Sequence, residues 1–256
     1  MTFLQAVILF IAAILGGTLN SVAGGGTFIT LPALIVTGVL PINANATSTI
    51  ALWPGTVASI WAYRKELVKQ RRGLVLVLSV TSLIGGILGA ELLLGTSQST
   101  FVKLLPYLLL LATVLFALSG PITARLRQRS IVSSRLSWPV VIGIAFLQLV
   151  ISIYGGYFGG GIGILMLATL GLMGMENIHE MNALKTLLTA FINGVAAAIF
   201  IVRGVVVWPA AIVMIVGAII GGYAGAYYAR QMNPLWVRWF VIVVGVTMTI
   251  YFFVRS

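Results

Sequence analysis

The first 63 residues of this chain contain no Asp, Glu, Lys, Arg or His. A soluble domain needs charged groups on its surface and does not leave a stretch of this length without them. At about 20 residues for each crossing of a bilayer, the stretch is long enough for about three spans. Further uncharged runs follow at 73–90, 104–124, 136–175, 204–229 and 239–254. Since 60% of the residues are hydrophobic and only 7% are charged, lipid must be the solvent for most of the chain.

Backbone N–H and C=O groups inside lipid have to be paired within the protein, which limits spanning structures to helices and closed barrels. The uncharged runs lack the strict alternation of apolar and polar residues that is typical of barrel strands. The sequence therefore predicts an all-α polytopic membrane protein. The first run has no basic segment before it and no convincing cleavage site after it, so we expect a retained helix rather than a removed signal peptide.

The charged residues exclude several other classes of protein. The net charge is +11, but the basic residues lie in short loops between apolar runs, which is the positive-inside pattern and not a nucleic-acid patch. With one His and no Asp, the chain has no plausible Ser-His-Asp triad, and no His, Asp or Glu group has metal-ligand spacing. It has no Cys and no P-loop. We expect neither an enzyme nor a bound metal or cofactor, and no nucleic-acid partner.

The chain contains an internal duplication. The segment GGGTFITLPAL at 24–34 is matched 135 residues further on by GGGIGILMLAT at 159–169. In the same order, 45–48 matches 182–185, 85–93 matches 221–229, and 101–116 matches 234–251. A chance similarity between glycine-rich stretches would not keep four landmarks in order. We therefore divide the chain into a first membrane repeat at 1–119, a basic cytoplasmic linker at 120–137 and a second membrane repeat at 138–256.

Each repeat holds five apolar segments, so we expect about ten helical segments. They lie at 3–22, 27–40, 46–63, 73–95 and 102–119, and at 138–156, 161–174, 182–202, 205–229 and 235–254. The second segment of each repeat is about 14 residues long, short of the ~20 that a full crossing needs. These two segments are expected to be half-helices or re-entrant pieces.

Loop charge gives the orientation. The loop at 64–72 carries five basic residues and is placed in the cytoplasm, and the uncharged loop at 95–100 is placed outside. In the second repeat, the counterpart of the basic loop is the nearly bare turn at Arg203, whereas the counterpart of the neutral loop carries Arg230. Because the bias changes sides and each repeat has an odd number of segments, the second repeat is expected to be inverted, with both termini outside and a pseudo-two-fold axis in the membrane plane.

Glycine triplets interrupt the chain at corresponding positions of the two repeats. Three consecutive glycines favour a helix break, and in lipid a break is tolerated where it lines a polar cavity or is buried in protein. The helical segment after each break would direct its free N–H groups and positive dipole end at the cavity, which suits an anion. Close helix packing is the alternative role for these glycines. The candidate binding residues here are Asn20, Gly24, Gly25, Gly26 and Thr27, with Gly159, Gly160 and Gly161 in the second repeat.

A second polar cluster follows each break. In the first repeat it contains Asn43, Asn45, Thr47, Ser48 and Thr49. In the second repeat Asn182, Lys185, Thr186, Thr189 and Asn193 fall on one face of a helix. We take Asn45, Thr47, Ser48, Asn182, Lys185 and Thr189 as further candidate binding residues, with Lys185 supplying a positive charge to an anion. Alternatively, Lys185 extends to the cytoplasmic interface and pairs with Glu176 or Glu180.

Glu91 lies in the glycine-rich fourth segment of the first repeat. An ionisable group in a membrane segment is a functional candidate, and Glu91 is a candidate for carrying a proton during coupling. The alternative is that Glu91 approaches the outer interface near Gly95.

At these residues the sequence resembles the TauE/SafE sulfite exporter family, also called the sulfonate uptake permease family. The matching features are 20–28 (NSVAGGGTF) with Pro32, 45–48 (NATS), and 159–163 (GGGIG) followed by 182–185 (NALK). The resemblance spans nearly the whole chain and implies export or uptake of sulfite, thiosulfate-like ions or small organosulfonates across the bacterial inner or plasma membrane. A sulfonate head offers three acceptor oxygens, which suits the predicted N–H groups, hydroxyls and lysine.

The sequence therefore predicts a multi-pass secondary transporter that moves a small sulfur-containing anion by alternating access, with its site at the two broken helices. The alternative function is a gated anion channel that uses the same site. A membrane-embedded enzyme is a third class, but no catalytic pair supports it. Besides the substrate and the lipid bilayer, a second copy of the chain is a possible partner.

Overall fold

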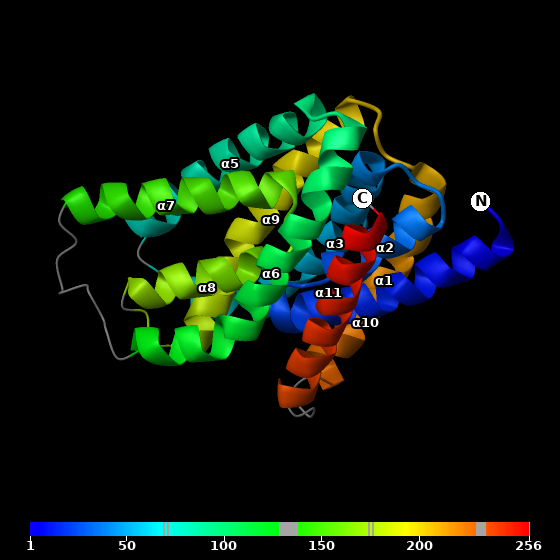
Figure 1. Cartoon of the computed structure of the whole chain (residues 1–256). Helices are drawn as coiled ribbons and strands as arrows, with labels where there is room; N and C mark the ends of the chain where they lie inside the picture. The colour runs from blue at the N-terminus through cyan, green and yellow to red at the C-terminus, as the bar shows by residue number, and fades with distance from the viewer. Residues whose placement is uncertain are drawn as a thin grey trace.

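The computed structural model describes residues 1–68, 70, 72–127, 138–173, 175, 177–228 and 234–255. In these residues the chain forms eleven α-helices and no strand, which confirms the all-α polytopic prediction (Figure 1). The helices are α1 (Phe3–Ala23), α2 (Thr27–Val36), α3 (Pro41–Ala62), α4 (Arg64–Val68), α5 (Arg72–Gly95), α6 (Gln98–Arg127), α7 (Trp138–Tyr157), α8 (Ile162–Leu172), α9 (Ile178–Val202), α10 (Trp208–Tyr228) and α11 (Pro234–Arg255).

The ten segments expected from the sequence correspond to all of these helices except α4, a short helix inside the basic loop at 64–72. Helix α6 continues to Arg127, beyond the end at 119 that the sequence predicted for the fifth segment. It passes through Gly120 and Pro121, which membrane helices tolerate better than soluble ones. The rest of the predicted linker, 128–137, lies outside the described residues.

Helices α2 and α8 are half-helices. They contain 10 and 11 residues, which at 1.5 Å per residue gives a length of about 15–17 Å. A hydrocarbon core is about 30 Å thick, so neither helix can cross it. Both are surrounded by other helices, with Phe28, Leu31 and Leu34 of α2 and Met166 and Leu170 of α8 buried.

The longer helices pack in pairs that correspond between the two halves. Helix α1 lies along α10, and its counterpart α7 lies along α5, on opposite sides of the molecule in Figure 1. Small residues allow these close approaches. A Cβ added at Gly17 would lie 2.9 Å from the Cα of Ala218, and one added at Gly156 would lie 3.0 Å from the Cα of Gly86. Helices α6 and α11 form a third pair, and α3 and α9 pack together in the centre.

Helices α3 and α9, counterparts in the predicted duplication, run in opposite directions. The Asn43 Nδ2 near the start of α3 donates to the carbonyl oxygen of Val205, just beyond the end of α9, at 2.8 Å. At the other end, the Gln70 Nε2 donates to the Glu180 Oε2 in the first turn of α9 at 3.2 Å. An inverted second repeat requires this relation between the two helices.

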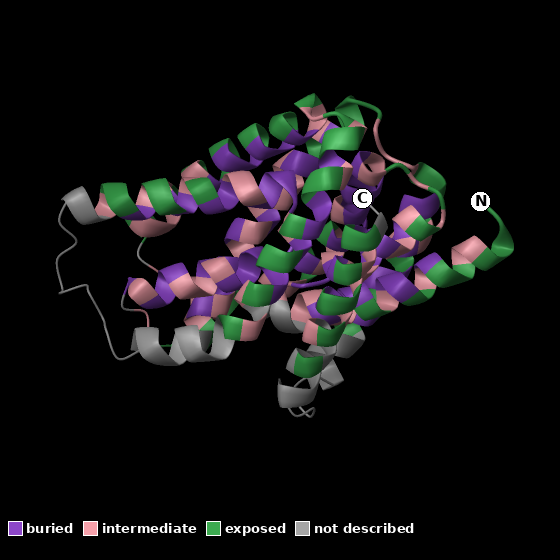
Figure 2. Ribbon diagram, viewed as in Figure 1, coloured by how far each residue is buried: buried purple, intermediate pink, exposed green. Residues whose placement is uncertain are grey.

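The outer surface of the helix bundle suits lipid. Four helical stretches in the described residues are long and apolar enough to cross a membrane, namely Phe3–Ser21, Arg72–Gly95, Gln98–Leu115 and His179–Val202. Large apolar side chains such as Leu15, Leu92 and Phe146 are exposed on the outside, and exposed residues follow the outer faces of the helices in Figure 2. An apolar surface of this extent marks contact with a membrane.

Candidate functional site

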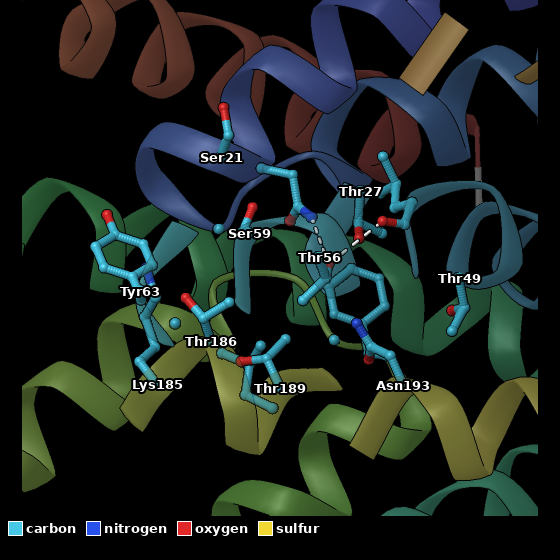
Figure 3. A pocket seen from close by; sticks show the side chains of 17 residues that line it. Ser21, Thr27, Thr49, Thr56, Ser59, Tyr63, Lys185, Thr186, Thr189 and Asn193 are labelled. Atoms are coloured by element: carbon cyan, nitrogen blue, oxygen red, sulfur yellow. Dashed lines mark hydrogen bonds between the residues drawn. The ribbon is translucent and has the colours of Figure 1, made fainter. Parts of the chain in front are cut away.

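A small polar cavity of about 40 Å³ lies where both helix breaks meet α3 and α9 (Figure 3). Because one water molecule needs about 10–15 Å³ measured in this way, the cavity has room for about three waters or a small oxyanion. It is lined by Asn20, Ser21, Gly24, Thr27, Thr49, Leu52, Thr56, Ser59, Tyr63, Phe158, Gly159, Ile162, Gly163, Lys185, Thr186, Thr189 and Asn193.

The two breaks, far apart in the sequence, are in contact. A Cβ added at Gly24 would lie 3.5 Å from the Cα of Gly163, and both residues line the cavity. Gly24 has a φ of +73° and Gly159 a φ of +77°, a left-handed conformation that favours glycine. Each break therefore turns the chain sharply at the cavity wall.

Both half-helices begin at the cavity. Thr27 is the first residue of α2 and Ile162 the first of α8, and both belong to the lining. The preceding residues, Gly26 and Gly161, offer no side-chain cap to the first N–H groups. Several N–H groups of the two first turns donate to carbonyl oxygens of the breaks, as Phe28 does to Gly25 and Ile162 to Gly159. The helix dipoles still place partial positive charge at the cavity, which favours an anion.

Helices α3 and α9 add two polar stripes on facing sides of the cavity. The stripe on α3 consists of Thr49, Thr56, Ser59 and Tyr63, and the stripe on α9 consists of Lys185, Thr186, Thr189 and Asn193. Figure 3 shows these side chains around a common space. The Asn20 Nδ2 donates to the Thr56 Oγ1 at 3.1 Å, which ties α1 to the stripe on α3.

Lys185 is the basic residue of the cavity lining, and its side chain is buried. The residue is 7% exposed, and its Nζ donates to the Oδ1 of Asn182 at 3.0 Å. Among the described residues no carboxylate lies within ion-pair distance of Lys185, since the single ion pair found there joins Arg203 and Glu91. Glu180 instead accepts hydrogen bonds from Gln70 and Asn177, and Glu176 lies outside the described residues.

The structure brings seven of the predicted binding residues to the cavity or next to it. Asn20, Gly24, Thr27, Gly159, Lys185 and Thr189 line it, and Asn182 holds the ammonium group of Lys185.

Four glycines of the triplets pack behind the wall. A Cβ on Gly26 would lie 2.9 Å from Leu52 Cδ1, and one on Gly161 would lie 3.3 Å from Ala112 Cβ. The carbonyl oxygen of Gly160 accepts from the Tyr154 hydroxyl at 2.7 Å, and Gly25 is not part of the lining. For these residues the structure favours the packing role.

The first-repeat residues Asn45, Thr47 and Ser48 are buried outside the lining. Each makes a contact of its own: the Asn45 Nδ2 donates to the Tyr157 carbonyl at 3.0 Å, the Thr47 Oγ1 accepts from the Val207 N–H at 3.1 Å, and the Ser48 Oγ lies 2.6 Å from the Thr30 Oγ1. The partners of Asn45 and Thr47 belong to the second half of the chain, and the partner of Ser48 belongs to α2 of the first half.

Glu91 lies at the surface, as the interfacial alternative expects. Its carboxylate is 44% exposed and lies 2.9 Å from the guanidinium of Arg203. It is not part of the cavity lining, so the structure offers no support for the coupling role.

The sequence analysis did not single out Thr56, Ser59, Tyr63 and Phe158 of the lining. For the three residues of α3, the signal was present in the spacing, because they follow Thr49 by 7, 10 and 14 residues and so continue one helical face. The duplication gave a second signal. Thr49 and Thr56 correspond to Thr186 and Asn193, 137 residues later, and all four line the cavity.

The lining is rich in groups that can donate hydrogen bonds. It combines one ammonium group, two helix N-termini, several hydroxyls and two amide side chains, and it includes no carboxylate. A polytopic helical protein with a polar cavity between two broken helices has the architecture of membrane transporters.

Comparisons with known proteins agree with this class. The family described as "Sulfite exporter TauE/SafE" matches residues 9–252, so the chain belongs to this family of membrane transporters. It is 29% identical to a "Probable membrane transporter protein" of Haemophilus influenzae, over 94% of this chain and 92% of that protein. It is 28% identical to the "Probable membrane transporter protein YfcA" of Escherichia coli K12, over 94% and 87%, and 28% identical to the "Probable membrane transporter protein ORF9" of a Sinorhizobium species, over 94% and 90%. No solved structure matches the chain.

Proposed function

We propose that this protein is a secondary transporter of small sulfur-containing anions, with sulfite, thiosulfate and organosulfonates as the candidate substrates. The observation that carries the proposal is Lys185: its ammonium group is buried against a cavity without a carboxylate partner among the described residues. A buried cation without a counter-ion is costly, and a bound anion would remove that cost. The two half-helix N-termini direct partial positive charge at the same space.

The proposed binding mode follows from the lining. The anion would accept a charge-assisted hydrogen bond from the Lys185 Nζ, and the partial positive charge at the starts of α2 and α8 would stabilise it further. The hydroxyls of Thr27 and Thr189 would supply neutral donors to the remaining oxygens. The volume of about 40 Å³ suits a compact oxyanion such as sulfite, so an organosulfonate would need the cavity to widen.

The arrangement of the helices supports alternating access. The two halves pack in corresponding pairs, and α3 and α9 run in opposite directions across the cavity. In transporters built from inverted repeats, one part of the structure rocks against the other around a site of this kind. The inverted orientation of the second repeat is itself part of this proposal.

The test is transport by the purified protein in liposomes. A carrier shows saturable uptake of labelled sulfite and counterflow, in which unlabelled sulfite inside accelerates the entry of labelled sulfite. A gated anion channel, the second candidate, uses the same cavity and gives flux without counterflow. Binding of sulfite, thiosulfate, sulfate, taurine and sulfoacetate is measured in parallel. If none of them binds and none is transported, the proposed function is wrong.

A further inference from the structure

The cavity extends towards one side of the membrane. Ser59 lies in the last turn of α3, and Tyr63 follows the last residue of this helix, directly before the basic loop at 64–72 that the positive-inside rule places in the cytoplasm. Figure 3 shows Tyr63 and Lys185 together at one end of the cavity. Thr49 is the lining residue of α3 that lies nearest to the outer end of this helix.

On the outer side of Thr49, polar side chains of the first half bind the α9–α10 loop at 203–207 of the second half. The Asn43 Nδ2 donates to the carbonyl oxygen of Val205 at 2.8 Å, and the Thr47 Oγ1 accepts from the N–H of Val207 at 3.1 Å. Gln98 fixes the Asn43 side chain, because its Nε2 donates to the Asn43 Oδ1 at 3.2 Å. These bonds cover the outer side of the cavity.

An ion pair at the surface also joins the two halves at this loop, and we call this set of contacts the junction. The Arg203 Nη2 lies 3.1 Å from the Oε1 and 2.9 Å from the Oε2 of Glu91, so one guanidinium nitrogen contacts both carboxylate oxygens. Glu91 belongs to α5 in the first half and Arg203 follows α9 in the second. The pair and the two bonds of Asn43 and Thr47 all cross between the halves at one end of the molecule.

The junction is suited to reversible opening. Its bonds are made by side chains to the backbone of a loop, and water can replace such bonds at little cost when the halves separate. Among the described side chains, the buried Asn45 Oδ1 beside this junction has no hydrogen-bond partner, so opening to water would satisfy it. Gly204 has a φ of +67° in the loop and Gly38 a φ of +92° before α3, which gives both connections glycine turns.

We propose that Asn43, Thr47 and Glu91, together with the loop at 203–207, form the extracellular gate of the transporter, and that the structure shows the cytoplasm-facing state with this gate closed. The proposal rests on the alternating access of the proposed function. It assigns to Thr47 and Glu91 a role in conformational change rather than in contact with the anion or in proton transfer.

The test uses thiol accessibility, because the chain has no cysteine and an introduced one is the only thiol. T49C places a reporter at the outer end of the cavity, and a small membrane-impermeant thiosulfonate is applied to right-side-out and inside-out vesicles. With the gate intact, modification is expected from the cytoplasmic side. Adding N43A and T47A removes the two neutral hydrogen bonds that cross between the halves, together with two bonds inside the first half. Each crossing bond contributes about five-fold to gate closure, so modification from outside should rise by about 25-fold.

The matched control is T100A in the T49C background. Thr100 also lies on the outer side, but its Oγ1 accepts from the Ser97 Oγ at 2.9 Å, within the first half. The T49C/T100A variant should be labelled to the same extent as T49C alone. If N43A/T47A does not fold, R203Q breaks the exposed ion pair and should raise outside labelling by about two- to five-fold.

Unchanged outside labelling in N43A/T47A and in R203Q overturns the gate, and so does an equal rise in T100A. This measurement contains no substrate, so it is independent of whether sulfite is transported. A labelling shift without any anion transport would support the gate and contradict the proposed function.

Discussion

The substitution K185M gives the sharpest test of the anion site. Methionine keeps an unbranched side chain of similar length and removes the ammonium group, which is bonded to the Asn182 Oδ1 at 3.0 Å in a residue that is 7% exposed. A hydrogen bond to a charged group contributes about 1.5–3 kcal/mol, which corresponds to a loss of affinity of about 10- to 150-fold. Truncation to alanine, K185A, should abolish anion binding in the same assay.

The assay is calorimetric titration of the purified protein with sulfite, and the control is K103M, which removes an exposed lysine of α6. The K103M dissociation constant should equal that of the unaltered protein. Thermal unfolding without ligand adds a second readout, because K185M removes a buried charge without a carboxylate partner among the described residues and should not lower the melting temperature. Equal sulfite affinity for K185M and the unaltered protein would remove Lys185 from the site, and with it the main argument for an anion.

Two further predictions concern the walls of the cavity. T189V removes one hydroxyl at nearly constant volume and should weaken sulfite binding about five-fold. The melting temperature should change little, because the Thr189 hydroxyl has only a weak contact with the Met166 Sδ at 3.5 Å. Unchanged affinity would exclude this hydroxyl from the site. G161A introduces a side chain at a φ of +74° and 3.3 Å from the Ala112 Cβ, so it should destabilise the protein by about 1–2 kcal/mol. Its control is G95A, where an added Cβ meets no atom within 4 Å, and equal melting temperatures of the two variants would contradict the strain.

The arrangement of polar side chains on α9 was accessible from the sequence. Asn182, Lys185, Thr186, Thr189 and Asn193 fall on one face because the helical period alone fixes their directions, and the structure places four of them in the lining. The same reasoning applied to α3 would have found Thr56 and Ser59.

The role of the polar residues at 45–48 was not accessible in the same way. Asn45, Thr47 and Ser48 are polar and lie next to Thr49, yet they bond to Tyr157, Val207 and Thr30. Whether a hydroxyl meets an anion or a backbone group depends on which distant segment covers it, and local periodicity carries no information on that. For the same reason, the glycines of each triplet have different roles: Gly24 and Gly159 line the cavity, whereas Gly26 and Gly161 pack against neighbouring residues.

The sequence by itself determined the membrane environment, the helical fold and the shortness of α2 and α8, because the absence of charge and the length of each apolar run are properties of the chain alone. Only the tertiary structure decided that the two breaks touch, that Lys185 stays buried beside them, and that Glu91 lies at the surface with Arg203. These outcomes depend on contacts between residues more than 100 positions apart, which form when the two halves pack against each other.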